Sequence, residues 1–271
     1  LRELGLSTLF LASLFIAIFA ASGAVAEEIE NKTISTVLTK PVQRPIFIIA
    51  KFFGIAAAVV LAHYICTIAF LMSVRHGVLE SAIDTVDWTV ITAGAATIIL
   101  SFALSIFFNY VYDWKLSSTA IALIALFGTL SLLFLAFVDK QWKFNPAGNG
   151  ISRFDIYGSI LLLLAAIIIT ALAVAFSARF NIVITLSACI GIFLLGLVSD
   201  YTFGRLADTC WWANIGRFLL PNLQVFWISD AIYEESVVPL KYVLIGALYT
   251  VSYSAGILAL AVGLFQRRQV G

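Results

Sequence analysis

The stretch EEIENKTISTVLTKPVQRP, residues 27–45, separates two long apolar runs and decides how this chain must fold. The run before it, residues 4–26, and the run after it, residues 46–72, are each long enough to cross a bilayer as a helix. The stretch itself gathers carboxylates, hydroxyls, two prolines and several cations. A turn of this polarity lies outside the hydrocarbon of a membrane, between one crossing and the next.

The composition of the whole chain agrees with this interpretation. Hydrophobic residues make up 62% of the 271 residues, and charged residues make up 11%. Soluble domains contain about 25% charged residues, so this composition is that of a polytopic membrane protein. The formal net charge of +1 provides no overall field that would attract nucleic acid. Cys66, Cys189 and Cys210 lie far apart and form neither a disulfide framework nor a zinc-site spacing.

The predicted fold class is all-α, a polytopic bundle of transmembrane helices. A helical span needs about 20 mostly apolar residues, and no segment alternates like a barrel strand. Seven segments are candidates, of which the sixth is the shortest, and together they predict one transmembrane domain over residues 1–271. The segments are 4–26, 46–72, 89–112, 117–138, 157–176, 182–198 and 240–265.

The orientation of the spans follows from the positions of Lys and Arg. With the 27–45 turn in the cytoplasm the total count of cations is balanced, but the short turns 113–116 and 177–181 then each hold a cation on the inside. Cations in long outer loops carry less weight. We therefore expect residues 27–44 and 267–271 in the cytoplasm, and residues 139–156 and 199–239 outside. An odd number of spans with a basic, cytoplasmic C-terminus also leads us to expect a further apolar span before Leu1.

The polar turn contains an amphipathic pattern. Read as a helix, residues 27–40 place Ile29, Thr33 and Leu38 near one face and charged or hydroxyl side chains on the other. Pro41 predicts the end of that helix, and Pro45 suits the first turn of the next one. One interpretation is an interfacial helix that only anchors the turn. The other is a docking element for a soluble partner, which the mixture of acids and cations favours over an anionic lipid surface.

The same stretch resembles the cytoplasmic segment of ABC exporter permeases of the second type. That segment shows acids, a threonine, a leucine, Pro-Val-x-Arg and then a span that contains lysine. These places are filled here by Glu27, Glu28, Glu30, Thr33, Leu38, Pro41, Arg44 and Lys51. Three later stretches are similar to one bacterial branch of the family: FLLGLVSDYTFGR at 193–205, LPNLQVFWISDA at 220–231 and LFQRRQVG at 264–271.

The resemblance implies a multi-pass permease of a bacterial cytoplasmic (inner) membrane that forms the translocation pathway of an exporter. It also implies a dimer with a second permease copy, and a separate nucleotide-binding ATPase subunit contacted through the eight residues named above. ATP and magnesium would bind to that partner, and this chain would hold no cofactor or metal and act as a transport subunit, not an enzyme. In agreement, no glycine is followed by lysine, so the chain has no P-loop.

Three alternatives remain at this stage. A proton-coupled or ion-coupled carrier requires charged residues in the middle of spans, where the chain has no acid. His63 and Cys66, three residues apart, are too few for a metal site, so a packed histidine is favoured. A membrane-embedded hydrolase would need a nucleophile with a base, which the chain does not present. A membrane anchor or scaffold without transport is the third alternative.

Two further patterns concern packing. Rows of small residues at every fourth position predict close helix contacts: Gly54, Ala58 and Ala62; Gly246, Thr250 and Ser254; Ala255, Ala259 and Gly263. The long 199–239 loop is rich in tryptophan and predicts short helices on the outer membrane interface. The alternative is that its aromatic residues pack on the bundle.

Overall fold

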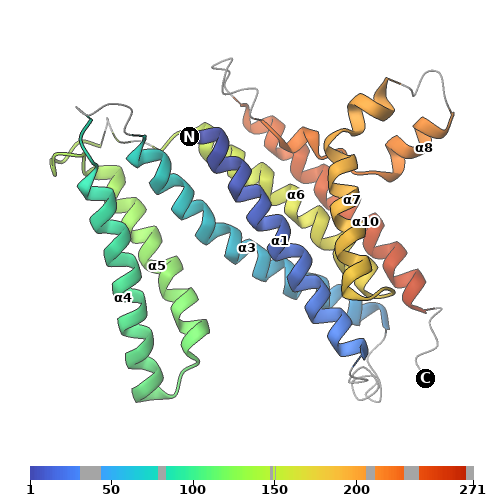
Figure 1. Cartoon of the computed structure of the whole chain (residues 1–271), viewed down its shortest axis with the longest axis horizontal. Coiled ribbons are helices and arrows are strands. Elements are labelled where there is room, and N and C mark those ends of the chain that lie inside the picture. Colours follow the sequence, from blue (N-terminus) through green and yellow to red (C-terminus); the bar gives the residue numbers. More distant parts are fainter. Residues whose placement is uncertain are drawn as a thin grey trace. The chain divides into compact units, whose positions relative to one another are not determined.

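The computed structural model describes residues 1–30, 44–78, 84–146, 149, 151–205, 211–228 and 238–266. These residues form helices, and the described part contains no strand, only an isolated bridge between Val138 and Phe144. The all-α prediction is therefore confirmed. The elements are α1 (Arg2–Glu30), α3 (Arg44–His76), α4 (Trp88–Tyr112), α5 (Leu116–Phe137), α6 (Arg153–Ser177), α7 (Ile182–Leu197), η1 (Asp200–Gly204), α8 (Trp211–Leu219), η2 (Gln224–Phe226) and α10 (Leu240–Gln266) (Figure 1).

Six of these helices are long and apolar enough to cross a membrane: α1, α3, α4, α5, α6 and α10. The predicted span 182–198 corresponds to α7, an apolar helix of 16 residues. At about 1.5 Å per residue its length is roughly 24 Å, which is short of the roughly 30 Å hydrocarbon core. The prediction of a helix there is right, but its length falls below that of a complete span.

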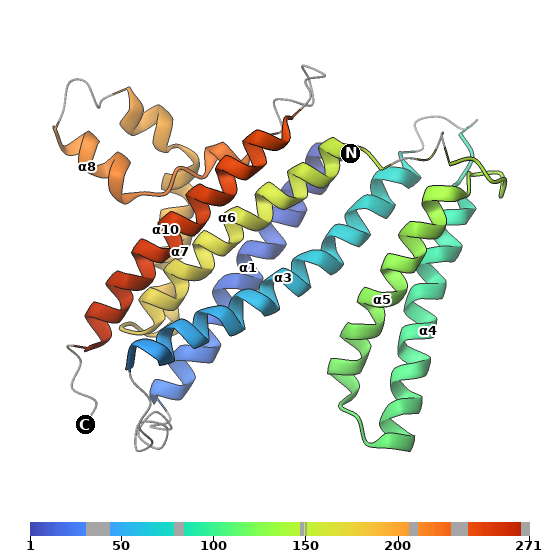
Figure 2. The same cartoon turned by 180° about the vertical axis from the view of Figure 1, so that it is seen from behind.

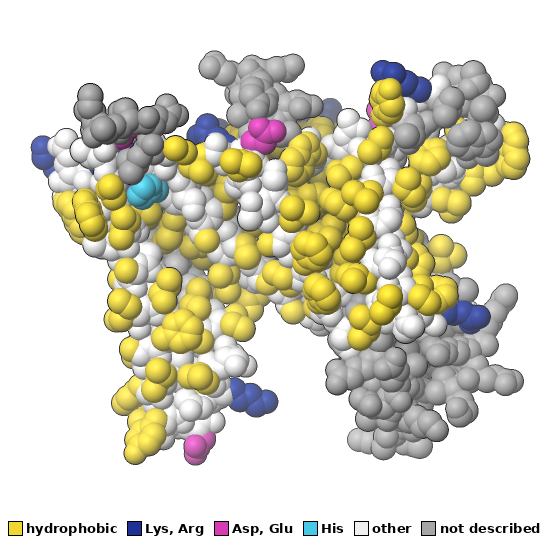
Figure 3. All heavy atoms as spheres, in the orientation of Figure 1, with side chains coloured by type: hydrophobic (Ala, Val, Ile, Leu, Met, Phe, Trp, Pro, Cys, Tyr) yellow, Lys and Arg dark blue, Asp and Glu magenta, His cyan; other side chains and the backbone are white. Residues whose placement is uncertain are grey.

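Polar and aromatic side chains mark the helix ends. On the face shown in Figure 3, charged side chains gather at the ends of the helices, and the surface between them is apolar or uncharged. Trp88 is the first residue of α4, and Trp114 follows its last turn and stacks on Phe108 at 5.1 Å. Both indoles are more than half exposed. Such rings favour the headgroup level of a bilayer, in agreement with the predicted ends of this span.

The described chain divides into two compact units, and α1, α3 and α6 each contribute residues to both. The first comprises residues 1–9 and 61–156, and the second comprises residues 10–60 and 157–271. Whether the two units together form one transmembrane domain, as predicted over residues 1–271, stays a prediction.

In the first unit, α4 and α5 form an antiparallel hairpin (Figure 2). Only residues 113–115 connect the two helices. Asp113 turns the chain with a positive φ of 55°, which asparagine and aspartate tolerate better than most residues, and its N–H donates to the carbonyl of Phe108. The predicted short turn at 113–116 is therefore present.

A row of small and hydroxyl side chains packs α4 against α5. Thr89, Ala93, Thr97, Ser101 and Ser105 recur at every fourth position of α4, and all are buried. The Thr97 and Ser131 hydroxyls hydrogen bond between the helices at 2.7 Å. Small side chains permit close approach in a bilayer, where association depends on packing and such hydrogen bonds.

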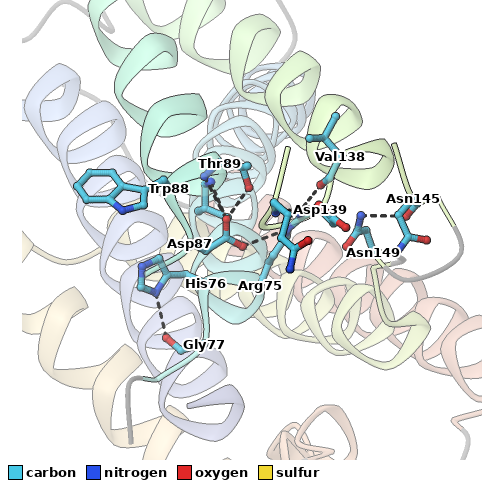
Figure 4. Close-up of polar contacts among 12 residues, drawn as sticks. Arg75, His76, Gly77, Asp87, Trp88, Thr89, Val138, Asp139, Asn145 and Asn149 are labelled. Atoms are coloured by element: carbon cyan, nitrogen blue, oxygen red, sulfur yellow. Dashed lines mark hydrogen bonds and ion pairs between the residues drawn. The ribbon is translucent and has the colours of Figure 1, made fainter. Parts of the chain in front are cut away.

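Asp87 joins the ends of three helices in the same unit (Figure 4). Its Oδ1 caps α4 by accepting hydrogen bonds from the N–H groups of Thr89 (3.1 Å) and Val90 (3.3 Å). Its Oδ2 lies 3.7 Å from Nε of Arg75, in the last turn of α3. Arg75 in turn donates from Nη2 to the carbonyl of Val138, directly after α5. One buried carboxylate and one arginine thus connect α3, α4 and α5.

The chain after α5 forms a compact polar turn. Oδ1 of Asp139 accepts hydrogen bonds from the N–H groups of Gln141 (2.8 Å) and Lys143 (3.0 Å). These bonds, led by that of Lys143, lower the pKa of the Asp139 carboxyl below its usual value. The ionised carboxylate is therefore the form that stabilises this turn.

In the second unit, α6 is the central helix. Its buried residues lie all around its circumference, as expected for a helix surrounded by others, and they include Leu161, Ala165, Ile168 and Ile169. One predicted small-residue row packs here: a Cβ on Gly246 of α10 would lie 3.2 Å from Leu161, and Thr250 and Ser254 are also buried. The other two rows, which start at Gly54 and Ala255, lie largely exposed on this chain.

Part of the 199–239 loop is bound along α10. The hydroxyls of Tyr242 and Tyr253 donate to the carbonyls of Val225 and Leu219, and Tyr249 accepts from the N–H of Asn222. These tyrosines span eleven residues of α10, or about 16 Å along its axis. The loop contains the predicted short helices, η1, α8 and η2, and their position at the outer membrane interface stays a prediction. Two aromatic side chains of the loop follow the alternative and pack on the bundle: Phe226 contacts Tyr249 of α10, and Trp227 contacts Phe10 of α1.

Candidate functional site

The predicted coupling residues lie around the connection between α1 and α3. Glu27, Glu28 and Glu30 belong to the last turns of α1, and Arg44 is the first residue of α3. Thr33, Leu38 and Pro41 lie outside the described residues. Lys51 lies on α3, with Nζ 5.9 Å from the centre of the Phe47 ring one turn earlier. Five of the eight residues are therefore placed at the facing ends of two membrane helices that follow one another in the chain.

The predicted first span, residues 4–26, and the start of the predicted amphipathic segment lie on one helix, because α1 continues without a break to Glu30. The helix continues because glutamate favours helical structure and no proline or glycine interrupts residues 24–30. The three glutamates therefore belong to the same helix as the first span. At the other end of the connection, Pro45 lies in the first turn of α3, as predicted.

The helix that carries these acids is built into the core of the second unit. Phe10, Leu14, Ala17, Ile18 and Ala21 recur on one face of α1, and each is at most 3% exposed. Phe10 contacts Phe193 of α7 edge to face, with ring centres 5.3 Å apart. A force on the Glu27–Glu30 end therefore acts on a helix whose buried face is packed in that core.

A family model described as ABC-2 family transporter protein matches residues 6–113. Over these residues the chain is similar to the ABC-2 transporter family. The predicted resemblance to ABC permeases of the second type is therefore confirmed over this region, which covers less than half of the chain. No curated protein and no solved structure gave a significant match.

The ABC-2 region contains most of α1, the connection to α3, all of α3 and all of α4. All eight predicted coupling residues fall inside it. Together with the apolar helices, this match identifies a multi-pass membrane protein with a permease region of ABC transporters. The family is one of transporter proteins, in agreement with a transport subunit.

Two buried titratable groups in the ABC-2 region, His63 and Asp87, have structural roles. His63 is 3% exposed within α3, in agreement with a packed histidine. Asp87 precedes α4 and is paired with Arg75, so this buried acid lies at a helix end, not at the centre of a span. Among the described residues, no group of three or more His, Cys, Asp or Glu side chains is arranged to hold a metal ion.

Sequence reasoning missed two sets of residues that organise the structure. The first is the row on α4 that runs from Thr89 to Ser105, whose spacing of four is visible in the sequence and is the signal for a packed helix face. The second is the set of tyrosines on α10, at positions 242, 249 and 253. Their spacing of seven and four places them on one helix face, but nothing local indicates that a loop backbone is their partner.

Proposed function

We propose that this chain is the permease subunit of an ATP-driven exporter in a bacterial cytoplasmic membrane. It would form the translocation pathway together with a second permease copy. A separate ATPase subunit would bind and hydrolyse ATP, and it would contact the chain through residues 27–45. The single observation that supports the proposal is the ABC-2 match, because it encloses this polar connection, most of α1 before it and all of α3 after it.

The coupling mechanism follows from the continuity of α1. Because Glu27, Glu28 and Glu30 extend the span helix, a partner that binds them acts on α1 without an intervening loop. The buried face of α1 then transmits the displacement to the helices around it as a rigid-body movement. ATP binding would favour one access state only if the ATPase binds the two states of the permease with different affinity.

The positions of the buried acids Asp87 and Asp155 favour the proposed role over that of a proton-coupled carrier. Asp87 and Asp155 both lie at helix ends and are each paired with an arginine. A proton-coupled carrier needs an acid that faces a pathway near the centre of the membrane.

Charge reversal tests the proposal. In the double variant Glu27→Lys with Glu30→Lys, we expect folding and membrane insertion to be retained, because acids at the polar end of a helix contribute little to stability. Co-purification with the partner ATPase should fall, or ATP hydrolysis should no longer respond to the permease. The matched control is Lys115→Glu, a charge reversal at an exposed position of another connecting turn, whose side chain makes no capping hydrogen bond.

The control should leave both readouts unchanged. Normal ATPase binding and normal stimulation in the double variant would show that these carboxylates are not the coupling surface. A loss of the same size in the control would point to a general effect of charge instead of a defined contact.

A further inference from the structure

A charged cavity of about 270 Å³ lies in the first unit, at the end where α3 finishes and α4 begins. Its charged lining consists of three cations, Arg2, Arg75 and Lys140, and two carboxylates, Asp87 and Asp155. Its apolar side is formed by α3 and α5, for example by Leu71 and Leu132. No part of the proposed coupling segment contributes to it.

The two carboxylates are already compensated. Asp155 lies 3.2 Å from Nε of Arg2, and Asp87 lies 3.7 Å from Nε of Arg75. Both carboxylates are buried, with side-chain exposures of 2% and 0%. In these two pairs each carboxylate neutralises one arginine. The positive charge of Lys140 is therefore the net charge of the cavity lining.

The cationic groups have unused hydrogen-bonding capacity. Among the described residues, Nη1 of Arg75 is buried without a hydrogen-bond partner. The ammonium group of Lys140 likewise has no ion-pair or hydrogen-bond partner in the part of the chain that the structure describes. The adjacent Asp139 does not supply one, because its Oδ1 accepts the N–H groups of its own turn. Unpaired cationic donors beside a cavity are matched by an anion that accepts several hydrogen bonds.

The N-terminus of α6 adds to the positive potential. The cavity adjoins its first turn, where Ser152 Oγ accepts the N–H of Phe154, whereas the N-terminus of α4 is already capped by Asp87. Helix N-termini carry a partial positive charge that favours anions. The volume lies just below the roughly 300–1,000 Å³ of pockets for drug-sized ligands, so the cavity suits a small headgroup.

We infer that this cavity binds a phosphate-bearing anion through Lys140 and Arg75. The phosphate group can belong to free inorganic phosphate or to an anionic phospholipid headgroup, whose acyl chains would lie against the apolar faces of α3 and α5. This inference is independent of the proposed coupling to an ATPase.

Thermal stabilisation of the full-length chain in detergent micelles tests the inference. The probes are inorganic phosphate and phosphatidylglycerol, with chloride at equal ionic strength and phosphatidylcholine as the respective controls. We expect saturable stabilisation by at least one probe and not by the controls, because a ligand that binds only the folded state raises its stability. Stabilisation by inorganic phosphate identifies a free anion as a ligand, and stabilisation by phosphatidylglycerol alone identifies a lipid headgroup.

Two lysine variants locate the site. Lys140→Gln should weaken the apparent affinity by about fivefold or more, since charge-assisted hydrogen bonds are the stronger ones, and Lys140→Arg should retain binding. Lys143→Gln is the matched control, because Lys143 lies in the same turn and does not line the cavity. Equal losses in Lys140→Gln and Lys143→Gln would overturn the inference in favour of diffuse surface charge. The absence of saturable stabilisation by either probe would also overturn it.

Discussion

Replacement of Asp87 separates two contributions of one carboxylate. Its Oδ1 caps α4 through the N–H groups of Thr89 and Val90, and its Oδ2 faces the guanidinium of Arg75. Asp87→Asn keeps an oxygen that can cap the helix but removes the negative charge. Asp87→Ala removes both. The difference between the two variants therefore measures the cap, and the effect of the asparagine measures the loss of the ion pair.

The magnitudes follow from burial and distance. Breaking a buried ion pair by removing one partner costs about 3–5 kcal/mol. Here Arg75 keeps its hydrogen bond to Val138 and is 16% exposed, and the 3.7 Å separation is longer than a hydrogen bond. We therefore expect Asp87→Asn to lower the free energy of unfolding by about 2–3 kcal/mol, at or below the low end of that range. Asp87→Ala should cost about 1 kcal/mol more, the usual value of an N-cap.

The assay is equilibrium unfolding in mixed micelles, with helix content by circular dichroism and thiol labelling of the buried Cys189 as two probes. Asn181 calibrates the cap, because it caps α7 through Ile184 at 3.0 Å and lies exposed. Asn181→Ala should cost about 1 kcal/mol, and Asn181→Asp should be close to neutral. In an Arg75→Met background the penalty of Asp87→Asn should shrink by more than half, since no guanidinium is then left uncompensated. An asparagine variant as stable as the unmodified chain would refute the ion-pair reasoning.

Three further predictions concern other parts of the chain. Tyr253→Phe removes the hydrogen bond to Leu219, so it should destabilise the chain by about 1 kcal/mol and increase hydrogen exchange in residues 219–225. The folded turn lowers the pKa of Asp139, so its carboxylate should stabilise residues 138–144 at pH values above its unfolded pKa of about 3.9. This stabilisation should be lost as the pH falls through the folded pKa. Hydrogen exchange of the turn, measured against pH and compared with Asp139→Asn, checks this. In a cysteine-free background, a membrane-impermeant thiol reagent added outside the cell should label Gly148→Cys and leave Thr36→Cys unlabelled, and the reverse result would invert the proposed topology.

The sequence by itself determined the features that depend on each segment alone. Apolar length predicted seven spans, and helices occupy all seven, six of them of spanning length, because the partition of a segment into a bilayer depends on the sum of its own side chains. The first-turn position of Pro45 and the terminal positions of Trp88 and Trp114 follow from equally local preferences. The eight predicted coupling residues also lie in one continuous stretch, so their pattern could be recognised from the sequence without knowledge of the fold.

The exact end of a helix was already less certain from local rules. Residues 27–30 are compatible both with a continued α1 and with the start of a new helix, because glutamate is a good helix former in either. In the structure the helix continues as far as Glu30, so the three acids belong to the same helix as the first span.

Only the tertiary structure decided which polar groups meet. The partners of Arg75, Asp87 and Val138, lie twelve and 63 residues away. The tyrosines of α10 bind a loop backbone that precedes them by 17 to 34 residues. Similarly, one of three equivalent small-residue rows packs inside the chain. A hydrogen bond or close contact needs two specific groups within about 3–4 Å, and that distance is set by how all the helices pack together, which no single segment encodes.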